Sequence, residues 1–430
     1  MPGNNKTSLI FSFGLYLLLF VIFYFFLPHS ILYYTIIYIS SSLLFLLLCI
    51  LIFQYEIPYR QILILIAAGV IIRLFFISSL PIGSEDVYRY IWDGKVQAHG
   101  INPYKYAPGD SALNALHSDR LPALVGYPQM KTIYFALSQI LFYLAYLIGG
   151  ENIFGIKLLL LLFEIASIAF ILLLLKKLKL PEKYVLFYAL CPLPIIQFAV
   201  DAHVDALGIT LIIMSLYFYF TEKKNLSFIF LGLSILIKPT LVLLIPILFL
   251  EEKNLLNRIK TVLIPAIVFV VLFIPYIISA NPFEALMVFA KNWTFNGLVF
   301  DILDSFIKNN QHSRIVSGLM FVVVYFFILR SKKDVLTKLY FSMFFLLIFS
   351  PVVHPWYAAW LAFLIPFRPK WSGILFVGLI SLTAYTVFVY QTTGDWHDYP
   401  FILALEYTPV IGYLIYEYYK QRRYGQAGLN

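Results

Sequence analysis

This chain of 430 residues has little charge: Asp, Glu, Lys and Arg together make up 12% of it. Soluble domains carry about 25% charged residues, so a water-exposed surface around most of this chain is excluded. Hydrophobic residues make up 61% of the chain and aromatic residues 18%. These proportions are typical of a polytopic membrane protein, whose helices face lipid or one another.

Cysteine is nearly absent. Cys49 and Cys191 both lie in apolar segments, which excludes a disulfide framework and a cysteine-based metal cluster. The formal net charge of +9 indicates no nucleic-acid partner, because the basic residues occur in short clusters between apolar runs. Such clusters are typical of the cytoplasmic loops of a membrane protein. No cofactor is indicated, although a divalent metal is left open.

Apolar runs long enough to cross a hydrocarbon core of about 30 Å recur along the chain. If the basic clusters mark the cytoplasmic side, these runs alternate in direction except at 131–149 and 226–250. We therefore expect 131–149 to lie on the outer surface or to dip partway into the membrane. We expect 226–250 to be a hairpin broken at Lys238-Pro239, since proline interrupts helices.

The predicted fold is all-α: one integral-membrane helix bundle over residues 1–430, with roughly 11–13 membrane segments. Two long external loops are predicted, at 81–153 and at 281–313. The alternation places both termini in the cytoplasm, with the plasma membrane as the expected location.

The stretch from Ser84 to Lys95 concentrates ionisable residues in a chain that has few of them. It predicts a helix with Ser84 as its N-cap and Glu85 and Asp86 in its first turn, ending near Gly100. Because carboxylates suit the positive end of the helix dipole, we expect Asp86 to keep a low pKa.

Helical spacing puts Asp86, Arg89, Tyr90 and Asp93 on one face, and Glu85 about a quarter-turn away. In a soluble protein this would be a solvated face with a Glu85–Arg89 pair. Next to a membrane, ionisable groups are costly and usually indicate a functional site.

The predicted topology brings further charged groups to the same outer side. Asp201 and Asp205 could instead cap a helix, Lys238 could extend its amine to the interface, and His354 could anchor the chain there. The His203-x-Asp205 pattern is weak as a metal motif, because a third ligand is missing. The joint placement of these groups is what predicts a site.

Carboxylates beside cations at a membrane surface suit group transfer from a lipid-linked donor. A carboxylate takes the proton of an acceptor hydroxyl, and cations stabilise the departing phosphate. Asp86 is the preferred base and Glu85 the alternative; the donor phosphate is assigned to Lys238, Arg89 and His203. The remaining candidates are expected to contact substrate: Asp93, Tyr90, Asp205, His354 and Trp356.

The residues from Asp86 to Gly94, followed by Gly100-Ile101-Asn102-Pro103-Tyr104, resemble the first external loop of GT-C glycosyltransferases. The closest resemblance is to bacterial polyprenyl-phosphate-mannose-dependent mannosyltransferases, and a more distant one is to the mannosyltransferases of glycolipid-anchor synthesis. Further matches are Tyr127-Pro128, His203-Val204-Asp205-Ala206-Leu207, Lys238-Pro239 and Pro355-Trp356-Tyr357. Gln129 stands where the family often has a second proline.

The resemblance implies an inverting transfer of a hexose, with mannose as the expected sugar, at the outer face of the membrane. It implies a polyprenyl-phosphate sugar donor, a hydroxyl-bearing glycan, lipid or protein acceptor, and a first-loop carboxylate as base, which Asp86 matches. A transporter or flippase for a lipid-linked or small anionic solute is the alternative. Against it, the chain has no inverted repeat, and its charges gather at one face instead of at the midplane.

Overall fold

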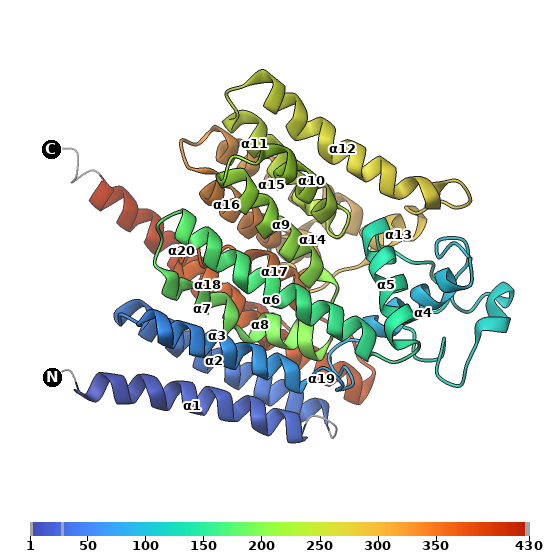
Figure 1. Ribbon diagram of the computed structural model, residues 1–430, viewed down its shortest axis with the longest axis horizontal. Coiled ribbons are helices and arrows are strands. Elements are labelled where there is room, and N and C mark those ends of the chain that lie inside the picture. Colours follow the sequence, from blue (N-terminus) through green and yellow to red (C-terminus); the bar gives the residue numbers. More distant parts are fainter. Residues whose placement is uncertain (1–2, 27–29, 426–430) are drawn as a thin grey trace.

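All regular elements of this protein are helices in the computed structural model, which describes residues 3–26 and 30–425 (Figure 1). Within those residues no strand forms, and one isolated bridge joins Phe295 to Val352. The prediction of an all-α bundle is therefore confirmed.

Five helical segments are long and apolar enough to cross a membrane, among the described residues. They are α2 (Ile31–Gln54), α6 (Phe154–Lys177), α12 (Leu255–Ile277), α15 (Asn310–Arg330) and the joined α18 and α19 (Trp371–Thr393). The predicted 184–199 span is broken instead of straight: Glu182–Ala189 and Pro192–Val200 meet at 41°, because Pro192 cannot continue a helix. Other helices of the bundle are α1 (Gly3–Phe26), α3 (Tyr59–Phe75), α9 (Asp205–Phe220), α16 (Val335–Phe349), α17 (Pro355–Ala362) and α20 (Pro400–Gly425).

The chain reverses between residues 224 and 251, as predicted. Helix α10 (Lys224–Ile235) ends just before Lys238, and a short 3-10 helix, η5 (Pro239–Leu243), leads into α11 (Leu244–Glu251). The Lys224 amine lies 3.0 Å from the Glu252 carboxylate, so the start of α10 and the end of α11 are side by side. Lys238 therefore stands at the tip of a helical hairpin.

The basic clusters gather at one end of the bundle. Lys338 pairs with Glu251 at 3.5 Å, and Lys183 pairs with Glu56 at 3.2 Å. Helix α1 begins and α20 ends at this end, whereas the first external loop lies at the opposite end (Figure 1). The arrangement agrees with the predicted alternation, and which end faces the cytoplasm stays a prediction.

The first external loop contains α4 (Asp86–Ala98), a 3-10 helix at Ser111–Leu116 and α5 (Ala136–Gly149). At 1.5 Å per residue, the 14 residues of α5 span roughly 21 Å, less than a hydrocarbon core. Helix α5 packs so closely against α4 at Gly94 that a Cβ there would come within 2.2 Å of the Phe142 carbonyl oxygen. This length and packing agree with the expectation that 131–149 does not cross.

The second external loop also contains helices, α13 (Glu284–Asn292) and α14 (Leu298–Ile307). Between them, Phe295 forms its bridge to Val352, just before α17. This contact joins the second loop to the segment that carries His354 and Trp356.

Candidate active site

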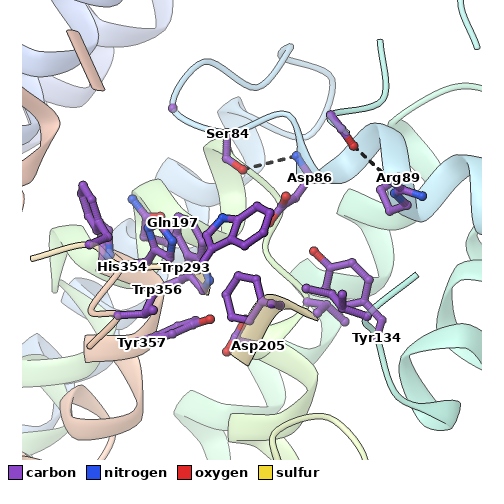
Figure 2. Close-up of a pocket in the computed structure, with 18 of the residues that line it drawn as sticks. Ser84, Asp86, Arg89, Tyr134, Gln197, Asp205, Trp293, His354, Trp356 and Tyr357 are labelled. Atoms are coloured by element: carbon purple, nitrogen blue, oxygen red, sulfur yellow. Dashed lines mark hydrogen bonds between the residues drawn. The ribbon is translucent and has the colours of Figure 1, made fainter. Parts of the chain in front are cut away.

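A cavity of about 1150 Å³ lies where the two external loops meet the bundle. Asp86, Tyr134, Asp205 and Tyr357 surround one space within it (Figure 2). The walls combine these polar groups with aromatic and aliphatic side chains from α13, η5 and α16. A cavity of this kind suits a ligand with both polar and apolar parts.

Asp86 is the first residue of α4, and its side chain is 36% exposed, to the cavity. The N-cap is Glu85 instead of the predicted Ser84, whose hydroxyl accepts a hydrogen bond from the Asp86 amide at 3.3 Å. Burial raises the pKa of Asp86 to about 6, and a hydrogen bond from Tyr134 only partly offsets it. The expected low pKa is therefore wrong, because desolvation outweighs the helix dipole.

Glu85 and Arg89 do not form the i,i+4 pair that a solvated face would give. Glu85 is exposed and its carboxylate lies against Gly126. Arg89 is buried, and its guanidinium donates to the carbonyls of Gly126, Tyr127 and Met130, each at 2.9 Å. Arg89 thus fixes the loop beside the cavity, and its contact with a donor phosphate stays a prediction.

Tyr90 and Asp93 share the predicted face but differ in what they reach. Tyr90 lines the cavity and stacks on Phe142, with ring centroids 4.4 Å apart. Asp93 is 2% exposed, is absent from the cavity wall, and accepts a hydrogen bond from Gln139 at 2.9 Å. The structure therefore places Asp93 behind the site, where it joins α4 to α5, which disfavours the predicted contact with substrate.

Asp201 fixes the segment that precedes Asp86. Its carboxylate accepts hydrogen bonds from the Ile82 and Gly83 amides at 3.0 and 2.8 Å and from the Tyr34 hydroxyl at 2.6 Å. Its side chain caps no helix, although Asp201 is the C-cap residue of a π-helical turn, η4 (Ile195–Val200), and its backbone N–H donates to the Ile196 carbonyl. Such turns are frequent at functional sites.

Asp205 and Lys238 form the central ion pair of the site, with 3.3 Å between the amine and the carboxylate. The Trp360 indole also donates to Asp205, at 2.6 Å, and the Lys238 amine lies 3.4 Å from the centre of the Tyr357 ring. Lys238 thus points into the protein and does not extend to the interface. Asp205 begins α9 without capping it.

His203 lies behind the cavity wall and faces Asp86. Its Nδ1 is 3.6 Å from Oδ2 of Asp86, beyond hydrogen-bond distance, and neither ring nitrogen has a hydrogen-bond partner. Burial lowers the pKa of His203, so the imidazole is neutral and this contact is no ion pair. His203 does not line the cavity, which disfavours the predicted contact with a phosphate.

The rings around Trp356 form a stacked column. The His203 and His354 rings each stack on the Trp356 ring, with centroids 3.8 and 4.3 Å from its centroid. Phe295 continues the column beyond His354 at 4.6 Å. His354 and Trp356 both line the cavity, as predicted for substrate contacts.

The candidate residues drawn from the sequence did not include Tyr134, Trp293 or Trp360, and Tyr357 appeared only within the Pro355-Trp356-Tyr357 match. Trp360 lies one helical turn after Trp356, a spacing that would have placed both on the same side of α17. Tyr134 and Trp293 come from loops, where no periodicity indicates which side chains turn inward.

No group of three or more His, Cys, Asp and Glu side chains suited to a metal ion occurs in the described part of the chain. The expectation that the protein needs no cofactor stays a prediction.

Comparison with protein families gives two matches. Residues 32–251, more than half of the chain, match the alpha-(1->6)-mannopyranosyltransferase N-terminal domain, and residues 310–414 match the MptB C-terminal domain. No curated protein and no solved structure matches. The first match spans α2 to α11 and so includes Asp86, the Asp201–Asp205 segment and Lys238. The chain therefore belongs to the alpha-(1->6)-mannopyranosyltransferase family and is a membrane mannosyltransferase.

Proposed function

We propose that this protein transfers mannose from a polyprenyl phosphate to a hydroxyl group of a glycan, lipid or protein acceptor, with inversion at the anomeric carbon. The observation that carries the proposal is the cavity itself, where Asp86 and the Asp205–Lys238 pair face one space among apolar helices. The polar part suits a sugar phosphate, and the apolar walls suit the chain of its lipid carrier.

Asp86 is the base in this proposal. It forms no ion pair with Lys or Arg among the described residues, whereas Asp205 is held by Lys238 and Trp360. A pKa of about 6 leaves Asp86 mostly ionised at neutral pH and makes it a stronger base than an ordinary aspartate.

The transfer is a single displacement. The acceptor oxygen bonds to the anomeric carbon as its proton passes to Asp86, and the bond from that carbon to the phosphate oxygen breaks. The bonding electrons stay with the phosphate, which gains one negative charge. A single displacement with inversion needs a base and no carboxylate nucleophile, because no glycosyl-enzyme intermediate forms.

Lys238 stabilises that charge in this proposal. Its amine lies at the tip of the hairpin and beside the cavity, 3.3 Å from the Asp205 carboxylate. A donor phosphate in the cavity would compete with Asp205 for this amine. Attraction that grows as the phosphate leaves lowers the barrier to transfer.

The test is an assay of purified protein in detergent with a panel of polyprenyl-phosphate sugars and candidate acceptors. A mannosyltransferase of this kind releases free polyprenyl phosphate and mannosylated product from the mannose donor without a sealed membrane. Absence of lipid-phosphate release from every donor, with transport in sealed vesicles, would assign the cavity to a transporter.

We also propose that the cavity opens at the outer face of the plasma membrane, with both termini in the cytoplasm. Cysteines introduced at Asn152 and Lys177 flank α6, and both native cysteines are buried. An impermeant thiol reagent applied to intact cells should label position 152 only. Labelling of position 177 alone would reverse the orientation, and labelling of both would overturn the crossing by α6.

A further inference from the structure

His203 is buried beside the base without a polar partner. Its side chain is 1% exposed, and neither Nδ1 nor Nε2 has a hydrogen bond. A buried polar group left unpaired costs free energy, so it persists where another state of the protein uses it. The hydrogen-bond acceptor that faces His203 is Oδ2 of Asp86, 3.6 Å from Nδ1.

The surroundings hold both partners of this contact in place. On one side, Asp201 binds the Ile82 and Gly83 amides and so fixes the approach to Asp86. On the other side, the Trp356 ring lies almost parallel to His203, at 18°. Only a shortening of roughly 0.6 Å separates this contact from an ordinary hydrogen bond, and catalytic hydrogen bonds often tighten when substrate binds.

We infer that His203 is a positioning residue for Asp86: its neutral imidazole donates the Nδ1 hydrogen to Oδ2 and leaves Oδ1 for the acceptor hydroxyl. The inference rests on the proposed role of Asp86 as base. A neutral imidazole carries one donor, and a carboxylate facing Nδ1 selects the tautomer with the hydrogen on that nitrogen.

His203 does not take the proton onward. Burial, together with the neighbouring His354 and Lys238, lowers the pKa of its ring, so a charged imidazolium is disfavoured. Its effect is on Asp86, because a hydrogen bond to the carboxylate favours the ionised form. The groups that face Asp86 and also set its charge are Glu85, Arg89, Tyr134 and Asp205.

Three substitutions separate this role from packing. His203→Phe keeps a ring against Trp356 and removes the nitrogens. His203→Asn places an amide N–H near the position of Nδ1, whereas His203→Gln places it near that of Nε2. We expect His203→Phe and His203→Gln to lower kcat on the order of 10-fold with the donor KM unchanged, and His203→Asn to recover most of that loss.

The pH profile is the second measurement. In the parent protein, kcat/KM should fall below about pH 6, as Asp86 becomes protonated. The hydrogen bond tightens in the substrate complex, whose pKa values kcat reports, so the acid limb of kcat should move to higher pH by roughly 1 unit in His203→Phe and His203→Gln. It should stay near its original position in His203→Asn.

Asp86→Asn, assayed in parallel, distinguishes the failure of this inference from that of the proposed function. If Asp86→Asn remains active, the proposed base is wrong. If Asp86→Asn is inactive while His203→Phe keeps the parent rate and acid limb, His203 is a packing residue only. Equal rates and equal acid limbs in His203→Asn and His203→Gln would also overturn the inference, with folding of each variant checked by thermal unfolding.

Discussion

Two groups of buried charges in this protein each pair a carboxylate with a cation but serve different purposes. Inside the bundle, Arg73 and Glu164 are almost fully buried and 3.1 Å apart, and Arg73 also donates to two backbone carbonyls. The Tyr188 hydroxyl donates a hydrogen bond to Glu164 at 2.5 Å, and the cavity beside the pair has a volume of only about 10 Å³. At the site, Asp205 and Lys238 are 3.3 Å apart beside a cavity of about 1150 Å³.

The difference lies in what each charge has left to offer. Apart from one Arg73 nitrogen, the interior groups already use their hydrogen-bonding atoms on the protein. At the site, Asp86 has no cation, and its contact with His203 is too long for a hydrogen bond. Saturated buried charges hold helices together, whereas unsaturated ones beside a cavity remain available to a substrate.

The largest expected effect is on transfer, in Asp86→Asn. The substitution keeps the shape of the side chain and removes its charge and basicity. We expect kcat to fall by about 10²–10⁴-fold, the usual range for general base catalysis, with donor affinity and thermal stability preserved. Release of polyprenyl phosphate measures it, and near-normal turnover would mean that another group takes the proton.

Substitution in the interior pair, Arg73→Met, should lower stability and leave transfer activity intact, the reverse of Asp86→Asn. Loss of one partner leaves the Glu164 carboxylate buried without its cation, which costs about 3–5 kcal/mol of stability. Thermal or denaturant unfolding in detergent measures this loss, while the folded fraction should retain its specific activity. The double variant Arg73→Met/Glu164→Leu should be more stable than the single one, and a single variant as stable as the parent would contradict the comparison.

Lys238→Met tests the cation of the site. Removal of one group that stabilises the leaving phosphate should lower turnover by about 10²-fold and weaken donor binding. Because Asp205 also loses its partner, Lys238→Met/Asp205→Asn is the matched control for its unpaired charge. Activity restored in the double variant would show that Lys238 acts only by neutralising Asp205.

The sequence alone predicted what depends on neighbours along the chain. Proline chemistry located the break at Lys238, and the alternation of the basic clusters set 131–149 apart from the segments expected to cross. Arg73 and Glu164 carried an unused signal, since each is a charge within an apolar run.

What depends on contacts between distant segments could not be predicted. Helical spacing put Arg89 and Asp93 on one face but gave no sign that Arg89 would bind carbonyls some forty residues later. The pKa of Asp86 depends on how deeply the two loops and the bundle bury it. The helix dipole alone therefore predicted the wrong direction.

The smallest expected effect is in Glu85→Gln, which sharpens the comparison within the site itself. Glu85 adjoins Asp86 in the sequence and lines the same cavity, but it is exposed and has no ion pair among the described residues. Its charge acts on neighbouring groups, among them Asp86, where it raises the pKa of the carboxyl. We therefore expect less than about a 3-fold change in kcat, in the range of an exposed pair worth 0.2–0.5 kcal/mol. The acid limb of kcat/KM should move slightly to lower pH, because removal of a neighbouring negative charge favours ionised Asp86. If Glu85→Gln is inactive and Asp86→Asn active, the base is Glu85. Burial beside the cavity would then not be the property that distinguishes the catalytic carboxylate from its neighbour.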